Sequence, residues 1–233
     1  MSKKQDKTRS LALTSLLASS VHDMKNSLNM LINTLDDVTE IIRPKDAESA
    51  DRLTQMVYET KRMNNHLVQM LTLYKIGNEQ YLLNVAEVDV ADFLDDVVLP
   101  HRELLAQRGV AVDVNIEDGL TWYFDKNLVA GIVHNILNNA YKYTRDRIEI
   151  KAWIEDGWLR LTIADNGPGY PEDMLKPDAF LQTGISFDTG STGLGLYFAH
   201  QVASLHSHNQ REGHIRFENS GIDGGGKFIL SLP

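Results

Sequence analysis

The sequence predicts an α+β protein in two parts: an N-terminal helical hairpin that forms a dimeric four-helix bundle, followed by an α/β sandwich. Two observations predict this class. Through about residue 75, apolar side chains recur at alternating steps of three and four, the period of one face of a coiled-coil-like helix. After Gly77-Asn78 the pattern changes to short alternating runs and amphipathic helical segments, as in a sandwich of helices on a mostly antiparallel sheet. We therefore expect one domain over residues 1–78 and a second over residues 79–233.

The hairpin consists of two predicted helices on either side of Pro44. The first runs from about Lys7 to Arg43, and proline ends it. Its apolar seam consists of Leu17, Val21, Met24, Leu28, Leu31, Leu35, Val38 and Ile42. The second seam consists of Leu53, Met56, Thr60, Met63, Leu67, Met70 and Tyr74. Because one hairpin leaves much of both seams uncovered, we expect a homodimer through residues 10–75. The alternative is a single hairpin packed on the second domain.

The second domain is expected to alternate strands and helices. Asp125 should cap a helix that buries Leu128, Ile132 and Ile136. Asp156-Gly157 should form the tight turn between two strands. The other elements are expected at the following ranges: strands near 81–88, 110–117, 148–155, 158–164, 214–218 and 227–232, and helices near 90–108 and 194–206.

The composition excludes several classes of protein. A formal charge of −9 argues against a nonspecific nucleic-acid binder, which needs a basic face. The chain has no cysteine, so disulfides and thiolate metal sites are excluded. No stretch approaches the roughly 20 apolar residues of a membrane span. We therefore expect a cytoplasmic protein with no nucleic-acid partner and no membrane span in this chain.

His22 is a candidate nucleophile. Counted from the first seam, His22, Asp23 and Asn26 fall on the face turned away from the partner helix, and His22 and Asn26 lie one turn apart. A solvent-facing imidazole with a neighbouring carboxylate can attack an electrophile. The alternative is an ordinary surface histidine, and the remaining sequence must decide between the two.

A helical stretch of the second domain carries an unusual polar face. Asn135, Asn139 and Lys142 are spaced by four and three, so they share one side of a helix that is otherwise buried. Buried amides need partners, and a hydrated Mg²⁺ with phosphate oxygens would supply them. The alternative is an amide pair that bonds to neighbouring backbone.

Two glycine-containing stretches complete the candidate site. Asp165 follows a buried strand and precedes Gly167 and Gly169, so its carboxylate can accept from an exocyclic amine such as that of adenine. The alternative is a plain Asx turn. The stretch Thr192-Gly193-Leu194-Gly195-Leu196 opens a helix, whose unpaired N–H groups can hold phosphate.

Together these stretches resemble the ATP-binding domain of sensor histidine kinases, the Bergerat fold shared with Hsp90, gyrase B and MutL. The stretch with Asn135, Asn139 and Lys142 corresponds to the N box. The stretch Asp165–Gly169 corresponds to the G1 box, and Thr192–Leu196 corresponds to most of the G2 box. His22-Asp23-Met24-Lys25-Asn26-Ser27-Leu28 is similar to the H box of the same family, with Ser27 where proline is most frequent. The resemblance covers residues 11–233. It implies ATP-binding residues at Asn135, Asn139, Lys142, Tyr143, Asp165, Gly167, Gly169, Thr192, Gly193, Leu194, Gly195 and Leu196, with Asn139 also holding Mg²⁺.

The function implied by the resemblance is ATP-dependent protein histidine kinase, a transferase of two-component signal transduction. His22 would attack the γ-phosphate, Asp23 would orient the imidazole and take its proton, and the phosphoryl group would pass to a response regulator aspartate. Asn26 would orient the water in the reverse dephosphorylation. Because only 21 residues precede His22, the signal is expected from a separate sensor subunit or from a region missing from this chain.

Three alternatives remain open. One is a Bergerat-fold serine kinase that acts as an anti-sigma-type switch, which needs no H-box histidine. The second is a phosphotransfer scaffold with a degenerate ATP domain, and the third is a structural ATPase whose hairpin is only a dimer clamp. Elsewhere, His206-Ser207-His208 is interpreted as a solvated helix end rather than a metal site, because no third ligand is close in sequence.

Overall fold

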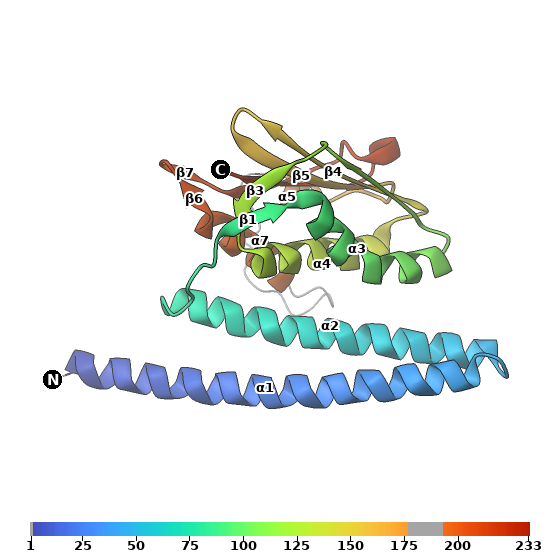
Figure 1. The fold of residues 1–233 in the computed structure, drawn as a ribbon, viewed down its shortest axis with the longest axis horizontal. Coiled ribbons are helices and arrows are strands. Elements are labelled where there is room, and N and C mark those ends of the chain that lie inside the picture. The colour runs from blue at the N-terminus through green and yellow to red at the C-terminus, as the bar shows by residue number, and fades with distance from the viewer. Residues whose placement is uncertain (1, 177–192) are drawn as a thin grey trace. The chain divides into compact units, whose positions relative to one another are not determined.

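The computed structural model describes residues 2–176 and 193–233. The chain divides into two compact units, Met1–Tyr81 and Leu82–Pro233. The first is a helical hairpin and the second is an α/β sandwich (Figure 1). In the part of the chain that the structure describes, no helix has an apolar stretch sufficient to cross a bilayer.

The first unit consists of two long antiparallel helices, α1 (Ser2–Ile42) and α2 (Ala47–Gly77) (Figure 1). The turn between them contains Pro44, as the sequence predicts. Asp46 caps α2: its carboxylate accepts from the backbone N–H of Ser49 at 3.1 Å and from the Ser49 hydroxyl. These hydrogen bonds lower the pKa of the Asp46 carboxyl, so the helix start is held by an ionised cap.

The apolar seams are only partly covered within one hairpin. On α1, Ile32 and Thr39 are buried although the predicted seam did not include them. The predicted seam residues Met24 and Leu31 are 43% and 46% exposed, and on α2 Met56, Met63 and Met70 are all more than half exposed. Each helix thus carries large apolar side chains at seven-residue intervals on its surface, where water contact is unfavourable.

The second unit contains a five-stranded sheet in the order β2-β4-β5-β9-β8. The bounds of these strands are β2 (Ala111–Ile116), β4 (Arg147–Glu155), β5 (Trp158–Asp165), β8 (His214–Glu218) and β9 (Lys227–Leu232). Only the β2–β4 pair is parallel, so the expectation of a mostly antiparallel sheet is confirmed. Asp156 and Gly157 both have positive φ, the geometry of the type I′ turn predicted between β4 and β5.

Three helices cover one face of this sheet: α3 (Val90–Gln107), α4 (Lys126–Tyr143) and α7 (Leu194–Leu205) (Figure 1). The core lies between the two layers and includes fully buried Ile148, Ile150 and Leu161 of the sheet and Ile132 and Leu137 of α4. Gly131 lets α4 and α7 approach closely, because a Cβ there would lie 2.9 Å from the ring of Phe198. This contact joins the two helices that carry the predicted N and G2 boxes.

Several small elements were not predicted. β1 (Ala86–Asp89) is shorter than the expected strand over 81–88, and it pairs with β3 (Thr121–Phe124), which the sequence reading omitted. The run Thr121–Phe124 contains three aromatic residues in succession, so its sequence shows no apolar–polar alternation, although its burial alternates once it pairs with β1. A two-residue ladder of β6 (Ser207–His208) and β7 (Arg211–Glu212), helix α5 (Glu172–Leu175) and the 3₁₀ turn η1 (Ile222–Gly224) also were not anticipated.

Candidate active site

His22 lies exposed on α1, with both of its nearest polar neighbours at the same ring nitrogen. Asp23 Oδ1 lies 3.6 Å from His22 Nδ1, and the side-chain amide of Asn26 lies 3.3 Å from the same atom. The side chains of His22 and Asp23 are 70% and 78% exposed, as the heptad position predicts. Within the described residues, Nε2 of His22 has no hydrogen-bond partner.

The two neighbours affect the tautomer of His22 in different ways. A carboxylate only accepts, so Asp23 favours a proton on Nδ1. Asn26, by contrast, faces Nδ1 with its Nδ2, which donates, so this contact favours an unprotonated Nδ1 unless the amide is rotated. With the proton on Nδ1, Nε2 carries the lone pair and can act as the nucleophile.

Ser27 leaves α1 continuous through this motif. Its hydroxyl donates to the carbonyl oxygen of Asp23 at 3.0 Å, one turn back along the helix. A proline here would remove an intrahelical hydrogen bond and bend the helix. Serine in place of proline is therefore consistent with the unbroken helix over Ser2–Ile42.

The predicted polar face of α4 exists, but its three residues differ in exposure. Asn135 is buried, Asn139 is half-buried and Lys142 is exposed. Asn135 Nδ2 donates to the carbonyl oxygen of Gly195 at 3.3 Å, and a Cβ on Gly195 would lie 3.1 Å from Asn135 Cγ. Asn135 therefore holds the start of α7 against α4. Its partner is a backbone carbonyl, as in the alternative interpretation that the amides of this face bond to neighbouring backbone.

Asn139 is the amide of this face that remains available. Among the described residues, no hydrogen bond reaches its side chain. A half-buried amide of this kind can accept a water or a cation at its oxygen. Lys142 lies three residues further on in the last turn of α4, followed by Tyr143, which is 52% exposed.

Asp165 ends β5 and is held by backbone on one side. Its Oδ1 accepts from the N–H of Gly167 at 2.7 Å and, more weakly, from the N–H of Gly226 at 3.4 Å. The first contact is an Asx turn, so the alternative interpretation of this motif is present in the geometry. Oδ2, by contrast, receives no hydrogen bond from the described part of the chain, and it can accept from a ligand.

Glycines bring the backbone close to Asp165 from two directions. A Cβ on Gly167 would lie 2.5 Å from the carbonyl oxygen of Tyr143, the last residue of α4. A Cβ on Gly225 would collide with the carbonyl oxygen of Asp165 itself, and one on Gly226 would lie 2.9 Å from Asp165 Oδ2. The end of α4 and the turn before β9 therefore both pack directly on the Asp165 loop.

The start of α7 carries the third predicted motif. Gly193 is the N-cap in the left-handed region at φ 61°, and no side chain caps the helix. The unpaired N–H groups of a first helical turn can bind an anion. Leu194 is buried, and Gly195 and Leu196 are half-buried. Thr192, also predicted to bind ATP, lies outside the described residues.

Two residues near Asp165 were missed by the sequence reading. Asn219 pairs with the backbone of Tyr170: its Oδ1 accepts from the N–H at 2.7 Å and its Nδ2 donates to the carbonyl at 3.0 Å. The Tyr170 ring packs edge-to-face on Phe217, and burial, with the nearby Asp165 charge, raises the pKa of the phenol. No local sequence pattern indicates this pairing, because Asn219 lies about 50 residues after Tyr170, in a turn.

The interpretation of His206 as a solvated helix end is wrong. His206 is 4% exposed: its Nδ1 donates to the carbonyl oxygen of Val202 at 2.8 Å, and its Nε2 accepts from the N–H of Asp125 at 3.0 Å. Burial lowers the pKa of the His206 imidazole, so it stays neutral. Both nitrogens are used, and no cluster of three metal-ligating side chains occurs among the described residues.

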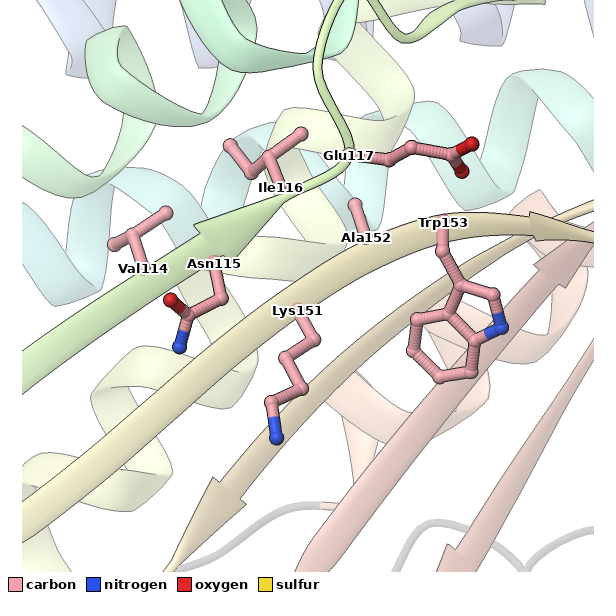
Figure 2. A pocket seen from close by; sticks show the side chains of 7 residues that line it. All are labelled: Val114, Asn115, Ile116, Glu117, Lys151, Ala152 and Trp153. Atoms are coloured by element: carbon pink, nitrogen blue, oxygen red, sulfur yellow. The ribbon is translucent and has the colours of Figure 1, made fainter.

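A shallow hollow of about 500 Å³ lies along β2 and β4, away from these motifs. Figure 2 shows Asn115, Lys151 and Trp153 on one side of the strands and Ile116 and Ala152 on the other. None of the predicted site residues lines this hollow, so it is not the predicted nucleotide site.

Residues 124–233 match the family model of histidine kinase-, DNA gyrase B- and HSP90-like ATPases. This range contains the Asn135–Lys142 face, the Asp165 loop and the start of α7. The second unit is therefore similar to the ATP-binding domains of this family over this range.

Over most of its length the chain is similar to sensor histidine kinases. It is 24% identical over 97% of its length to the sensor protein RprX of Bacteroides fragilis, covering 45% of that protein. It is 27% identical over 91% of its length both to the histidine-protein kinase AfsQ2 of Streptomyces coelicolor and to the sensor histidine kinase CpxA of Escherichia coli, covering 41% and 46% of them. The chain spans about half the length of the curated relatives it matches.

Solved structures share the fold. The Acinetobacter baumannii histidine kinase AdeS matches with a TM-score of 0.59 and 20% identity, over 86% of this chain and 95% of that one. Full-length ShkA in complex with AMPPNP matches with a TM-score of 0.63 and 20% identity, over 94% of this chain and 45% of that one. The α+β architecture predicted from the sequence is thus confirmed.

Proposed function

We propose that this chain is the kinase core of a two-component system, which transfers the γ-phosphoryl group of ATP to His22 and then to an aspartate of a response regulator. The observation that carries the proposal is the environment of His22: an exposed imidazole with Asp23 and Asn26 both at Nδ1, in the same chain as an ATP-binding domain. Both neighbours lie at one ring nitrogen, and Nε2 has no hydrogen-bond partner among the described residues.

The phosphoryl transfer would balance as follows. The lone pair of His22 Nε2 forms the P–N bond while the bond from the γ-phosphorus to the β,γ-bridging oxygen breaks, and ADP leaves. The ring becomes cationic as the bond forms, and Asp23, 3.6 Å from Nδ1, accepts the Nδ1 proton. The phosphoimidazole is then neutral at the ring and can donate its phosphoryl group to a carboxylate.

The second unit offers groups that fit ATP. Oδ2 of Asp165 has no partner among the described residues and would accept from the adenine amino group. The first-turn N–H groups of α7 and the Lys142 ammonium would bind phosphate oxygens. ATP-analogue binding by ShkA, a protein of the same fold, supports this placement.

The residues present also fit Mg²⁺ that is held mainly through the nucleotide. Asn139 supplies one half-buried amide without a partner in the described chain, and no carboxylate cluster occurs beside it in that part. Mg²⁺ commonly keeps several waters and binds through substrate phosphates in such sites. When bound, the ion would neutralise charge on the phosphates. Asn139 would orient it through a water or through its own oxygen.

We also propose that the chain works as a homodimer. The support is the exposed apolar stripe of the hairpin, Met24 and Leu31 on α1 with Met56, Met63 and Met70 on α2. A second hairpin would cover these side chains in a four-helix bundle. No observation favours the serine kinase, scaffold or structural ATPase alternatives over a histidine kinase.

Incubation with γ-labelled ATP and Mg²⁺ tests the proposed activity. We expect labelled protein that is stable in base and labile in acid, the behaviour of a phosphoramidate, and label mapping to the peptide that contains His22. Label that survives acid would identify a serine, threonine or tyrosine acceptor and would overturn the proposal. Release of inorganic phosphate without any labelled protein would favour a structural ATPase.

A further inference from the structure

Asn166 is one of the most buried polar residues of the second unit, and no site role was predicted for it. It lies between Asp165 and Gly167 and is 4% exposed. Its backbone N–H donates to the carbonyl oxygen of Arg147 at 3.3 Å, which extends the β4–β5 pairing by one residue. A buried amide side chain at this position must be fully hydrogen-bonded to be tolerated.

The Oδ1 atom of Asn166 is surrounded by donors from one short loop. The backbone N–H groups of Asp146 and Arg147 both donate to it at 3.1 Å. The Thr144 hydroxyl lies 3.1 Å from the same oxygen and 3.0 Å from the carbonyl of Arg147, so its single proton serves one of the two at a time. Thr144 is the C-cap of α4, and Arg147 is the first residue of β4.

The other half of the amide has a different partner. Nδ2 of Asn166 donates to the carboxylate of Asp146 at 2.7 Å. This fixes the orientation of the amide, because a flipped side chain would set its NH₂ group against two backbone N–H donors and its oxygen against a carboxylate. Four groups of the loop between α4 and β4 therefore bond to one side chain of the Asp165 loop.

These contacts connect two of the predicted nucleotide-binding motifs. α4 carries Asn139 and Lys142 near its C-terminal end, and Asn166 binds the residues that directly follow that end. The Asp165 loop packs closely on the end of α4, because a Cβ on Gly167 would lie only 2.5 Å from the carbonyl oxygen of Tyr143. A change at Asn166 would therefore shift the Asp165 carboxylate relative to Asn139 and Lys142.

We infer that Asn166 is a positioning residue of the nucleotide site, a clamp that fixes the separation between the end of α4 and the Asp165 loop. It touches no nucleotide atom in this role; it acts through Asp165 on one side and through Thr144–Arg147 on the other. The inference rests on the proposed ATP binding. It adds Asn166 to the nucleotide site as a residue that affects nucleotide affinity indirectly.

A reciprocal exchange of the two side chains tests the clamp. Asn166→Asp keeps the size and the Oδ1 acceptor but places a second carboxylate oxygen against Asp146 at the position of a 2.7 Å hydrogen bond. Asp146→Asn is the matched control, because its amide oxygen can still accept from Asn166 Nδ2. The double variant Asp146→Asn/Asn166→Asp restores one donor facing one acceptor, now with the donor on residue 146.

Calorimetric titration of the full chain with Mg–ADP measures the effect without turnover. We expect Asn166→Asp to bind about tenfold more weakly, in the range for a buried polar group that loses its partner. Asp146→Asn should stay within about twofold of wild type, and the double variant should recover most of the loss. Asn166→Asp with unchanged affinity, or a double variant as weak as the single one, would overturn the clamp.

Amide hydrogen exchange provides a readout that does not depend on nucleotide. In the ligand-free chain, the N–H groups of Asp146 and Arg147 should exchange faster in Asn166→Asp and slow again in the double variant. If Asn166→Asp does not fold, Thr144→Val removes only a hydroxyl from the clamp and should weaken Mg–ADP binding by about two- to fivefold. An unchanged Thr144→Val affinity would then count against the clamp. Wild type that binds no Mg–ADP would instead overturn the proposed function.

Discussion

His206 Nε2 accepts the backbone N–H of Asp125 at 3.0 Å, so the residue just beyond α7 bonds to the N-cap of α4. Asp125 in turn caps α4 with Oδ1, which accepts from Asn127 and Leu128, and accepts from the N–H of Asn84 with Oδ2. The two helices that carry the predicted N and G2 boxes are thus joined at the end remote from Asn139. This junction requires a neutral imidazole, because Nε2 must keep its lone pair.

We expect the second unit to lose stability as the pH falls below about 6.5, the ordinary histidine pKa. Burial lowers the pKa of His206, and also those of His134 and His214, in the folded chain. The unfolded chain therefore takes up protons first, and stability that is complete above pH 6.5 declines toward the lowered folded pKa. Urea unfolding can be followed by fluorescence, since Trp122, Trp153 and Trp158 all lie in this unit.

The variant His206→Gln should be less stable at neutral pH but should show a shallower decline between pH 7.5 and 5.5 than wild type. His208→Gln is the matched control, because His208 is exposed and should leave the slope unchanged. Equal slopes in wild type and His206→Gln would show that His206 does not contribute to the acid sensitivity.

The variant His22→Gln should abolish labelling from ATP and leave Mg–ADP affinity unchanged. Glutamine keeps a polar side chain on an exposed helix face but has no nucleophilic nitrogen lone pair, so the helix should be undisturbed. Labelling and calorimetry on the same preparation separate the two effects. His66→Gln, on α2, is the control that should label normally. Label on His22→Gln would disprove the assigned acceptor.

The variant Asp165→Asn should weaken nucleotide binding by about 1–3 kcal/mol. The asparagine oxygen can keep the 2.7 Å bond from the Gly167 N–H, so the turn survives, while its NH₂ group replaces the Oδ2 acceptor. Calorimetry with Mg–ADP measures the loss, and Asp113→Asn on the exposed edge of β2 controls for the change in charge. Identical affinities of Asp165→Asn and wild type would exclude an adenine contact by Asp165.

The variant Leu31→Ala/Met63→Ala should shift the chain from dimer to monomer. Both side chains are about half exposed in one hairpin, so their truncation removes little packing within the chain but much of a dimer contact. Sedimentation equilibrium should show the change, and far-ultraviolet dichroism should show unchanged helix content. Wild type that sediments as a monomer at high concentration would exclude the bundle.

The variant Asn26→Ala should autophosphorylate but dephosphorylate a response regulator more slowly. The amide lies 3.3 Å from His22 Nδ1, on the stripe where a docked regulator would meet the imidazole, and it can both donate to and accept from a water. The rate is measured with purified phospho-regulator and the full chain. Equal rates for variant and wild type would leave Asn26 with no role beyond its contact with His22.

The sequence predicted the elements that have a strong period. The two heptad seams, the cap at Asp125 and the Asp156-Gly157 turn were all identified, because local side-chain chemistry determines them. It missed β3, whose register depends on pairing with distant β1, and it placed the buried side of α1 slightly wrongly at Ile32. Tertiary contacts determine the pairing of β3 and the buried side of α1, and local sequence patterns do not reveal such contacts.

The same division holds within the site. Asp165 and Asn139 carry groups without partners in the described chain, and their motifs are local in sequence. Asn135, by contrast, bonds to Gly195, 60 residues downstream, so its partner was not foreseeable from the helical spacing. The supporting residues Asn166, Asn219 and His206 were missed for a related reason: each bonds to backbone brought near by the fold, and backbone partners leave no motif.

The glycines before β9 impose a constraint on how this protein can evolve. At Gly225 a methyl group would overlap the carbonyl oxygen of Asp165, and at Gly226 it would press on the carboxylate. Side chains at these two positions are therefore restricted by the backbone and the carboxylate of a residue some 60 positions earlier in the chain. Replacement of Asp165 could relieve the contact at Gly226, which meets its side chain, but not the contact at Gly225, which meets its backbone.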